Sequence, residues 1–122
     1  MTLKDYALAR IDALEKRVGT EAGKTLDSGH PDAIHDLRVS IRRLTQSLRA
    51  LEQVAGKQRV KRTRRRLRKW MDAAAEIRNR DIALELVEAS GTALDSPLAM
   101  RLKKDRDTAH QRLARLLAES RT

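Results

Sequence analysis

Apolar residues recur every three or four positions along nearly the whole chain, which is the period of an amphipathic α-helix. The repeat falls into four segments, at about residues 3–27, 31–54, 58–89 and 97–119, and no stretch has the pattern of a strand. Short turns join the segments, so neighbouring helices should run antiparallel. The sequence therefore predicts an all-α fold in which residues 1–122 form one antiparallel four-helix bundle.

Each segment has an apolar seam, and glycine, serine and proline mark the breaks between segments. Gly19 and Gly23 weaken the first helix and predict a break or bend there. Gly56 should end the second helix, and Ser96 with Pro97 should start the fourth. The expected seam residues are Leu3, Ala7, Ile11, Leu14, Val18, Ala22 and Leu26, then Ile34, Leu37, Ile41, Leu44, Leu48 and Leu51, then Val60, Leu67, Trp70 or Met71, Ala74, Ile77 and Leu84, then Leu98, Leu102, Ala109, Leu113 and Leu116.

The net charge of +10 is concentrated in one third of the sequence. Residues 30–70 contain 13 Lys or Arg against three acids, whereas the remainder has 14 of each. Within this region the run KQRVKRTRRRLRK, residues 57–69, has nine basic residues and no acid. Like charges this dense repel each other, so we expect an anionic partner; a solvated helix face is the plainer interpretation.

Basic residues form a stripe beside the apolar seam of the second predicted helix. With Ile34 at zero on a helical wheel, Arg38, Arg49, Arg42 and His35 fall at about 40°, 60°, 80° and 100°, and Arg43 falls near 180°. The stripe is about 21 Å long, which suits an extended polymer better than a small metabolite. The planar guanidinium group matches phosphate oxygens two at a time, so phosphate is the expected anion. A histidine near a helix start can instead simply satisfy backbone groups.

Two stretches resemble the CHAD domains, the conserved histidine α-helical domains. The first is IHDLRVSIRRLTQSL, with a histidine, an arginine three residues later and then an arginine pair. The second, LRKWMDAAAEIRNRDIALEL, is similar to the family's basic helix that leads to an Arg-Asp-x-Asp element. The resemblance implies inorganic polyphosphate binding by two pseudo-symmetric four-helix halves around a basic cavity. It carries over His35, Arg38, Arg42 and Arg43 from the first stretch, and Arg78 and Asp81 from the second.

The sequence departs from the family pattern in three respects. Thr45 replaces a residue that is often basic, and Asn79 replaces the first acid of the second element. The full family domain is more than twice as long, so this chain corresponds to one half of it. We therefore expect a homodimer whose two-fold axis replaces the internal pseudo-symmetry.

Asp81 lies on the apolar stripe of the third predicted helix, about 40° from Ile77. A carboxylate in such a place should be paired. Arg78 or an arginine of the second helix is the expected partner, and Asp81 would then orient basic side chains. The plainer alternative is an intrahelical ion pair.

The sequence predicts a non-catalytic module that binds inorganic polyphosphate without a cofactor or metal. It contains no paired carboxylates, no nucleophile with a base and no Gly-rich phosphate loop. The expected location is the cytoplasm, with polyphosphate granules and a separate triphosphatase-type partner suggested by the resemblance. The predicted binding residues are His35, Arg38, Arg42, Arg43, Arg49, Arg64, Arg65, Arg68, Lys69, Arg78, Lys104 and Arg112, with Asp81 orienting them.

Three other functions use the same residues. A nucleic-acid-binding module could lay the basic run along a backbone, although an aromatic content of 2% argues against stacking on single strands. A metal-dependent phosphohydrolase could use His30, His35 and Asp32 or Asp36, but their spacing matches no common ligand pattern. A purely structural bundle would use the charge for solubility. The chain has no cysteine and no signal peptide or membrane span is recognisable, which fits a reducing compartment.

Overall fold

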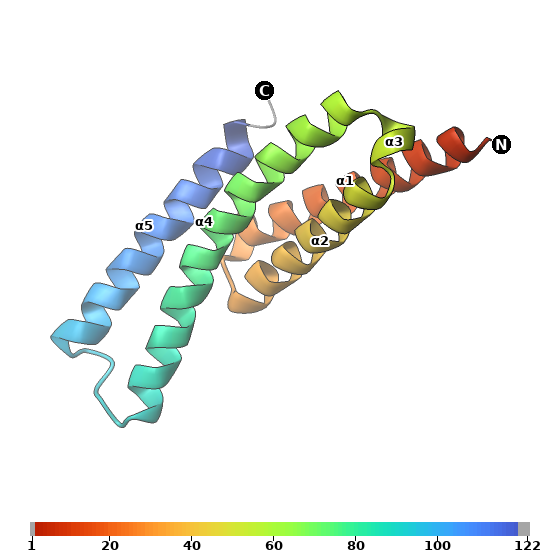
Figure 1. Cartoon of the computed structure of the whole chain (residues 1–122). Coiled ribbons are helices and arrows are strands. Elements are labelled where there is room, and N and C mark those ends of the chain that lie inside the picture. The colour runs from red at the N-terminus through yellow and green to blue at the C-terminus, as the bar shows by residue number, and fades with distance from the viewer. Residues whose placement is uncertain (1, 120–122) are drawn as a thin grey trace. The chain divides into compact units, whose positions relative to one another are not determined.

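A computed structural model describes residues 2–119, and almost all of them are helical (Figure 1). The helices are α1 (Leu3–Ser28), α2 (Pro31–Ala50), α3 (Glu52–Ala55), α4 (Lys57–Ala89) and α5 (Pro97–Glu119). The described range contains no strand, which confirms the all-α class. The chain divides into two compact units, Met1–Met71 and Asp72–Thr122, and α4 runs through both.

The predicted C-terminal end of the second helix, at residue 54, is wrong, because two helices occupy the range 31–54. α2 ends at Ala50, and α3 is a separate helix of four residues. Leu51 between them has φ −106° and ψ 13°, and the Val54 amide donates to the Leu51 carbonyl at 3.1 Å instead of continuing the α-helical ladder. Gly56 then has φ 99°, a backbone conformation that favours glycine, and α4 begins at the next residue.

The predicted break at Gly19 and Gly23 does not occur, because α1 is continuous through both. Val18 and Ala22 beside them are buried on the same seam. A glycine within a helix costs about 1 kcal/mol relative to alanine, and continuous packing of the seam outweighs that cost.

Side chains cap three of the helices at their N-termini. Thr2 and Asp5 form a reciprocal capping box at the start of α1. The His30 Nδ1 atom accepts a hydrogen bond from the Asp32 amide at 3.1 Å and caps α2. The predicted cap of α5 is confirmed, since the Ser96 hydroxyl accepts from the Ala99 amide at 3.3 Å.

In the unit Met1–Met71, α1 and α2 form an antiparallel pair joined by a two-residue turn (Figure 1). Most predicted seam residues of this unit are buried: Ala7, Ile11, Leu14, Val18, Ala22, Ile34, Leu37, Ile41, Leu44, Leu48, Val60, Leu67 and Trp70. Leu26, Leu51 and Met71 are only half-buried. The predicted burial of Leu3 is wrong, because its side chain is 69% exposed. Leu3 lies in the first turn of α1, where the apolar period continues but no neighbouring helix covers it.

In the unit Asp72–Thr122, the second half of α4 pairs with α5. Glu76 contacts Arg112 and Asp81 contacts Arg106, so residue numbers rise along α4 as they fall along α5 and the two helices are antiparallel. The buried apolar residues are Ala73, Ala74, Ile77, Val87, Ala99, Ala109, Leu113 and Leu117. The predicted burial of Leu98 is wrong, because its side chain is 56% exposed. Ala99 and Leu117 occupy the inward positions at the two ends of α5 instead. Leu84, Leu102 and Leu116 are half-buried.

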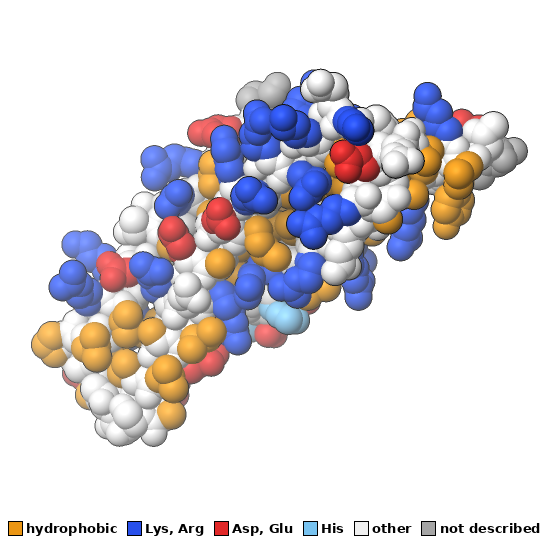
Figure 2. Space-filling model, in the orientation of Figure 1, with side chains coloured by type: hydrophobic (Ala, Val, Ile, Leu, Met, Phe, Trp, Pro, Cys, Tyr) orange, Lys and Arg blue, Asp and Glu red, His pale blue; other side chains and the backbone are white. Residues whose placement is uncertain are grey.

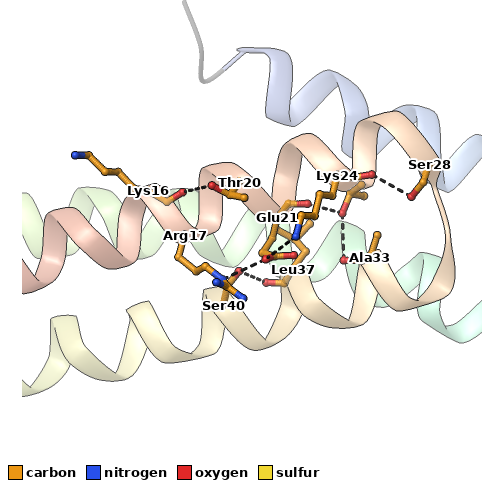
Figure 3. A network of polar contacts seen from close by, with 10 residues as sticks. Lys16, Arg17, Thr20, Glu21, Lys24, Ser28, Ala33, Leu37 and Ser40 are labelled. Carbon is orange, nitrogen blue, oxygen red and sulfur yellow. Dashed lines mark hydrogen bonds and ion pairs between the residues drawn. The ribbon is translucent and has the colours of Figure 1, made fainter.

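A polar network interrupts the seam between α1 and α2 (Figure 3). Glu21 is 1% exposed, and its Oε1 atom lies 3.1 Å from Arg17 Nε and 3.7 Å from Lys24 Nζ. Buried Ser40 on α2 donates to the Leu37 carbonyl at 2.7 Å. The Glu21 Oε2 atom is buried without a hydrogen-bond partner. The sequence pattern did not predict this buried carboxylate.

Leu44→Ala and Leu3→Ala test the observed core. Leu44 is 1% exposed, so removing its side chain should lower the free energy of unfolding by about 2–5 kcal/mol. Leu3→Ala should change it by less than about 0.5 kcal/mol, since the side chain is already exposed. Urea unfolding followed by circular dichroism at 222 nm measures both, and equal losses would contradict the assigned burial.

Candidate functional site

The basic side chains of α2 are available to a ligand. His35, Arg42, Arg43 and Arg49 are exposed, and Arg38 is half-buried. None of the five forms a hydrogen bond or ion pair within the described residues 2–119. The Arg38 Nε atom is itself buried without an acceptor. These cations are therefore not neutralised by acids of this part of the chain.

Two of the nine cations at the start of α4 have a contact of their own. Arg59 Nη2 lies 3.1 Å from Asp12 Oδ1 and 3.8 Å from Glu15 Oε1, both on α1. The Arg66 guanidinium lies 5.4 Å from the centre of the Trp70 ring. The other seven make no hydrogen bond or ion pair in the described range: Lys57, Lys61, Arg62, Arg64, Arg65, Arg68 and Lys69.

The contacts with α1 show which flank of each helix carries the free cations. On α2, the Ala33 carbonyl accepts from the Thr25 hydroxyl of α1, and Arg38 lies about 140° round the helix from Ala33. On α4, Arg59 contacts α1, and Arg64 also lies about 140° round the helix from that residue. The free cations that lie about 140–180° from these contacts, on the flanks remote from α1, are His35, Arg38, Arg42 and Arg49 of α2 and Lys57, Lys61, Arg64 and Arg68 of α4.

We call these two stripes together the cationic face. Figure 2 shows Lys and Arg side chains gathered over α2 and the first half of α4, with few acids among them. The face consists of His35, Arg38, Arg42 and Arg49 of α2 and Lys57, Lys61, Arg64 and Arg68 of α4. Of these, Lys57 and Lys61 were absent from the predicted set, although the basic run contains them.

The predicted residues Arg43, Arg65 and Lys69 lie on the outward sides of the same helices, about 140–180° from the seam positions Ile34 and Val60. Gln58, Lys61, Arg62 and Arg65 line a shallow open hollow on the outside of α4. Arg43, Arg62, Arg65 and Lys69 belong to the same unit as the cationic face but point to solvent rather than along its flank, whereas Lys61 of the cationic face borders the hollow.

The remaining predicted residues belong to the other unit, and two of them have acidic partners. Arg78 Nη1 lies 3.8 Å from Glu85 Oε1, and Arg112 Nη1 lies 3.1 Å from Glu76 Oε1. The Lys104 side chain is exposed and makes no hydrogen bond or ion pair within residues 2–119. Charge on this unit is therefore partly compensated.

Asp81 is buried and paired, but the expected partner was wrong. Its Oδ1 atom accepts from Arg106 Nε of α5 at 2.5 Å, whereas Arg78 pairs with Glu85. The antiparallel register of α4 and α5 sets Arg106 opposite Asp81, and that register is not visible in either helix alone. Asp81 is 6% exposed and its Oδ2 atom is buried without a partner. The pair ties α4 to α5.

Within residues 2–119, no three His, Cys, Asp or Glu side chains lie close enough together to hold a metal ion. His30 and Asp32 approach to 3.7 Å, but His30 serves as the α2 cap. None of the described helices is both long and apolar enough to cross a membrane.

Asp81→Ala should be strongly destabilising, because it removes one member of an ion pair whose side chains are only 6% and 18% exposed. The expected loss in free energy of unfolding is about 3 kcal/mol. Glu76→Ala is the matched control, since the Glu76–Arg112 pair is well exposed and should cost less than about 1 kcal/mol. Chemical denaturation compares the two, and similar losses would mean that the buried pair contributes no more than a surface one.

Comparison with known proteins gives one match. The family model of the CHAD domain matches residues 6–122. No curated protein and no solved structure gives a match. Since the family match covers nearly the whole chain and includes both stretches that carry the sequence resemblance, this protein belongs to the CHAD domain family.

Proposed function

We propose that the protein is a non-catalytic module that binds inorganic polyphosphate on the cationic face. The observation that carries this proposal is that eight basic side chains of α2 and the first half of α4 lie on the flanks remote from α1, with no acid of the described residues paired to them. The association of CHAD domains with polyphosphate binding supports it.

The side chains of the face suit a chain of phosphates. Six of the eight are arginine or histidine donors that can each contact phosphate oxygens while remaining spaced along a helix. The α2 stripe alone extends about 21 Å, long enough for several phosphate units. Arg38 is already partly desolvated and has no protein acceptor, so it loses little hydration when it meets an anion.

Binding of this kind is polyvalent. Each phosphate that contacts an arginine or lysine displaces condensed counterions, so affinity should rise with polymer length and fall steeply with salt. The outward cations Arg43, Arg65 and Lys69 extend the positive surface of the unit Met1–Met71. Arg78, Lys104 and Arg112 would supply further contacts to the polymer from the unit Asp72–Thr122. The role of Asp81 in this proposal is to pair with Arg106. The pair holds α4 against α5.

We also propose how the helices pack and how two copies of the chain associate. The helices would form an antiparallel bundle, and two copies would associate about a two-fold axis. We place the protein in the cytoplasm at polyphosphate granules, where a triphosphatase-type partner could act on the bound polymer.

Nucleic acid is the alternative ligand, favoured by the outward cations on α4 around the hollow at Arg62 and Arg65. Backbone contacts to duplex DNA or structured RNA would use these side chains without stacking. Competition at fixed salt between fluorescent polyphosphate and duplex nucleic acid distinguishes the two, and preferential retention of nucleic acid would favour the alternative.

Arg42→Glu and Arg68→Glu test the cationic face on its two helices. Each should raise the Kd for long-chain polyphosphate about tenfold or more, because a charge-assisted contact is lost and a repulsion gained. Lys16→Glu is the control, since Lys16 is exposed on the outer side of α1 and the charge change is identical. Fluorescence anisotropy at fixed ionic strength measures all three. A Lys16→Glu effect as large as the others would indicate that net charge alone governs binding.

Polyphosphate should also stabilise the fold by mass action, because it binds the folded arrangement of charges. We expect a higher Tm with long-chain polyphosphate than with orthophosphate at the same total phosphorus concentration. Differential scanning fluorimetry at constant sodium concentration measures the shift. Equal shifts would show that the protein responds to phosphate groups singly and not to the polymer.

A further inference from the structure

Exposed apolar side chains gather at one end of the α4–α5 hairpin. Seven large apolar side chains are exposed among the described residues, and five of them lie between positions 82 and 100: Ile82, Leu86, Leu94, Leu98 and Met100. Figure 2 shows apolar side chains clustered around the loop that joins α4 to α5. Leu86 is 66% exposed, so this end of the hairpin offers apolar surface that residues 2–119 leave uncovered.

The exposed residues of α4 lie opposite its contact with α5. Ile77 and Asp81 face inward within the hairpin. On a helical wheel Ile82 is about 140° and Leu86 about 180° from Ile77. Ile82 and Leu86, about one turn apart, therefore form a second apolar stripe of α4 on the side away from α5. A pair of helices buries one seam only, and a second stripe calls for another partner.

Local charge allows a second copy to approach here. Residues 81–100 contain no Lys or Arg, whereas the chain as a whole has a net charge of +10. Its four acids, Asp81, Glu85, Glu88 and Asp95, give the segment a charge opposite in sign to that of the chain as a whole, which lowers the repulsion between two cationic copies that meet here.

Arg78 and Glu85 make the stripe complementary to itself. They lie on the same flank of α4, seven residues apart, with Ile82 between them along the helix axis. A two-fold axis at Ile82 makes the second α4 antiparallel to the first. The flank that carries Arg78 and Glu85 then lies on the same side of the contact in both copies. Arg78 then comes within about one residue's rise of Glu85 of the second copy. Within one chain these two groups are separated by 3.8 Å, a long ion pair that can exchange partners.

We propose that a second copy of this chain covers the stripe, with the two α4 helices antiparallel about Ile82 and Arg78 facing Glu85 of the second copy. The inference rests on the dimer included in the proposed function, and it locates the interface on a part of α4 separate from the cationic face. Leu86 lies in the apolar centre of the contact, and Leu94, Leu98 and Met100 enlarge it around the hairpin loop.

Sedimentation equilibrium of the full chain over a range of concentrations tests the interface. The unaltered chain should have twice the monomer mass at micromolar concentrations, and Leu86→Glu should be a monomer. Leu3→Glu should remain a dimer, because Leu3 is equally exposed but lies on α1. Circular dichroism confirms that each variant retains its helix content. A monomeric unaltered chain, or a Leu86→Glu dimer as tight as the unaltered one, would overturn the proposal.

Charge variants test the antiparallel arrangement itself. Glu85→Lys sets a lysine against Arg78 of the second copy and should weaken the dimer at least tenfold. Glu88→Lys is the matched control, since it makes the same charge change about 120° round the helix from Ile82. Equal effects of the two variants would overturn the proposed pairing.

A cysteine substitution gives an independent readout, because the natural chain has no cysteine. Ile82→Cys on the expected axis should form an intermolecular disulfide rapidly under mild oxidation, and Leu3→Cys should not. Equal cross-linking of both would contradict the location of the axis. Measuring the polyphosphate affinity of Leu86→Glu separates the proposed interface from the proposed ligand. A monomeric Leu86→Glu variant that still binds polyphosphate is consistent with both proposals. An unaltered chain that dimerises but binds no polyphosphate refutes the proposed ligand and leaves the interface standing.

Discussion

Repulsion among the cations of α2 and the first half of α4 is the constraint on which the rest of the structure depends. Two unit charges 4 Å apart in water interact by about 1 kcal/mol, and the basic run of α4 carries nine cations over residues 57–69. Among the described residues, Arg59 alone of these cations is paired with acids, namely Asp12 and Glu15 of α1. The apolar seam must therefore hold together helices whose surfaces repel each other, and any bound polyanion relieves part of that cost.

The acids of the chain are used mainly away from the cationic face. Asp12 and Glu15 pair on the α1 side of α4, and Glu21 pairs with Arg17 and Lys24 of its own helix. Acids of the other unit pair with arginines there. This distribution leaves His35, Arg42 and Arg68 with solvent as their neighbour. A positive surface on a folded protein requires such separation, because mixed charges would pair with each other first.

The two buried carboxylates, Glu21 and Asp81, have the same arrangement. In each, one oxygen meets an arginine Nε atom and the other is buried without a partner. A fully apolar residue would cost less to bury, so neither pair is explained by stability alone. Each holds a guanidinium in one place, and Asp81 does so between two helices, where it also fixes their register.

The sequence was sufficient for the class of fold, because the helical period of apolar residues requires no tertiary information. It located the buried seam well in the middle of each helix, as at Ile41 or Leu67, but failed at helix ends such as Leu3 and Leu98. There the period continues although no neighbouring element covers it. The basic stripe of α2 was also predictable without tertiary information, because the angular positions of its residues depend on the geometry of a single helix. The partner of Asp81 was not, because the register of α4 against α5 depends on packing along both helices.

The composition of α4 changes along its length, and the change separates two kinds of interaction. Its first half is cationic and its last turns are apolar with acids nearby. Salt acts differently on these parts: it screens the attraction between arginine and phosphate, whereas apolar contacts are not weakened by screening. The same salt also reduces repulsion between two cationic molecules. Ligand binding and self-association can therefore respond in opposite directions to ionic strength, although one continuous helix carries both surfaces. Because the two surfaces share no residue of the cationic face, a polyanion bound to the first half of α4 leaves the stripe around Ile82 uncovered by direct contact.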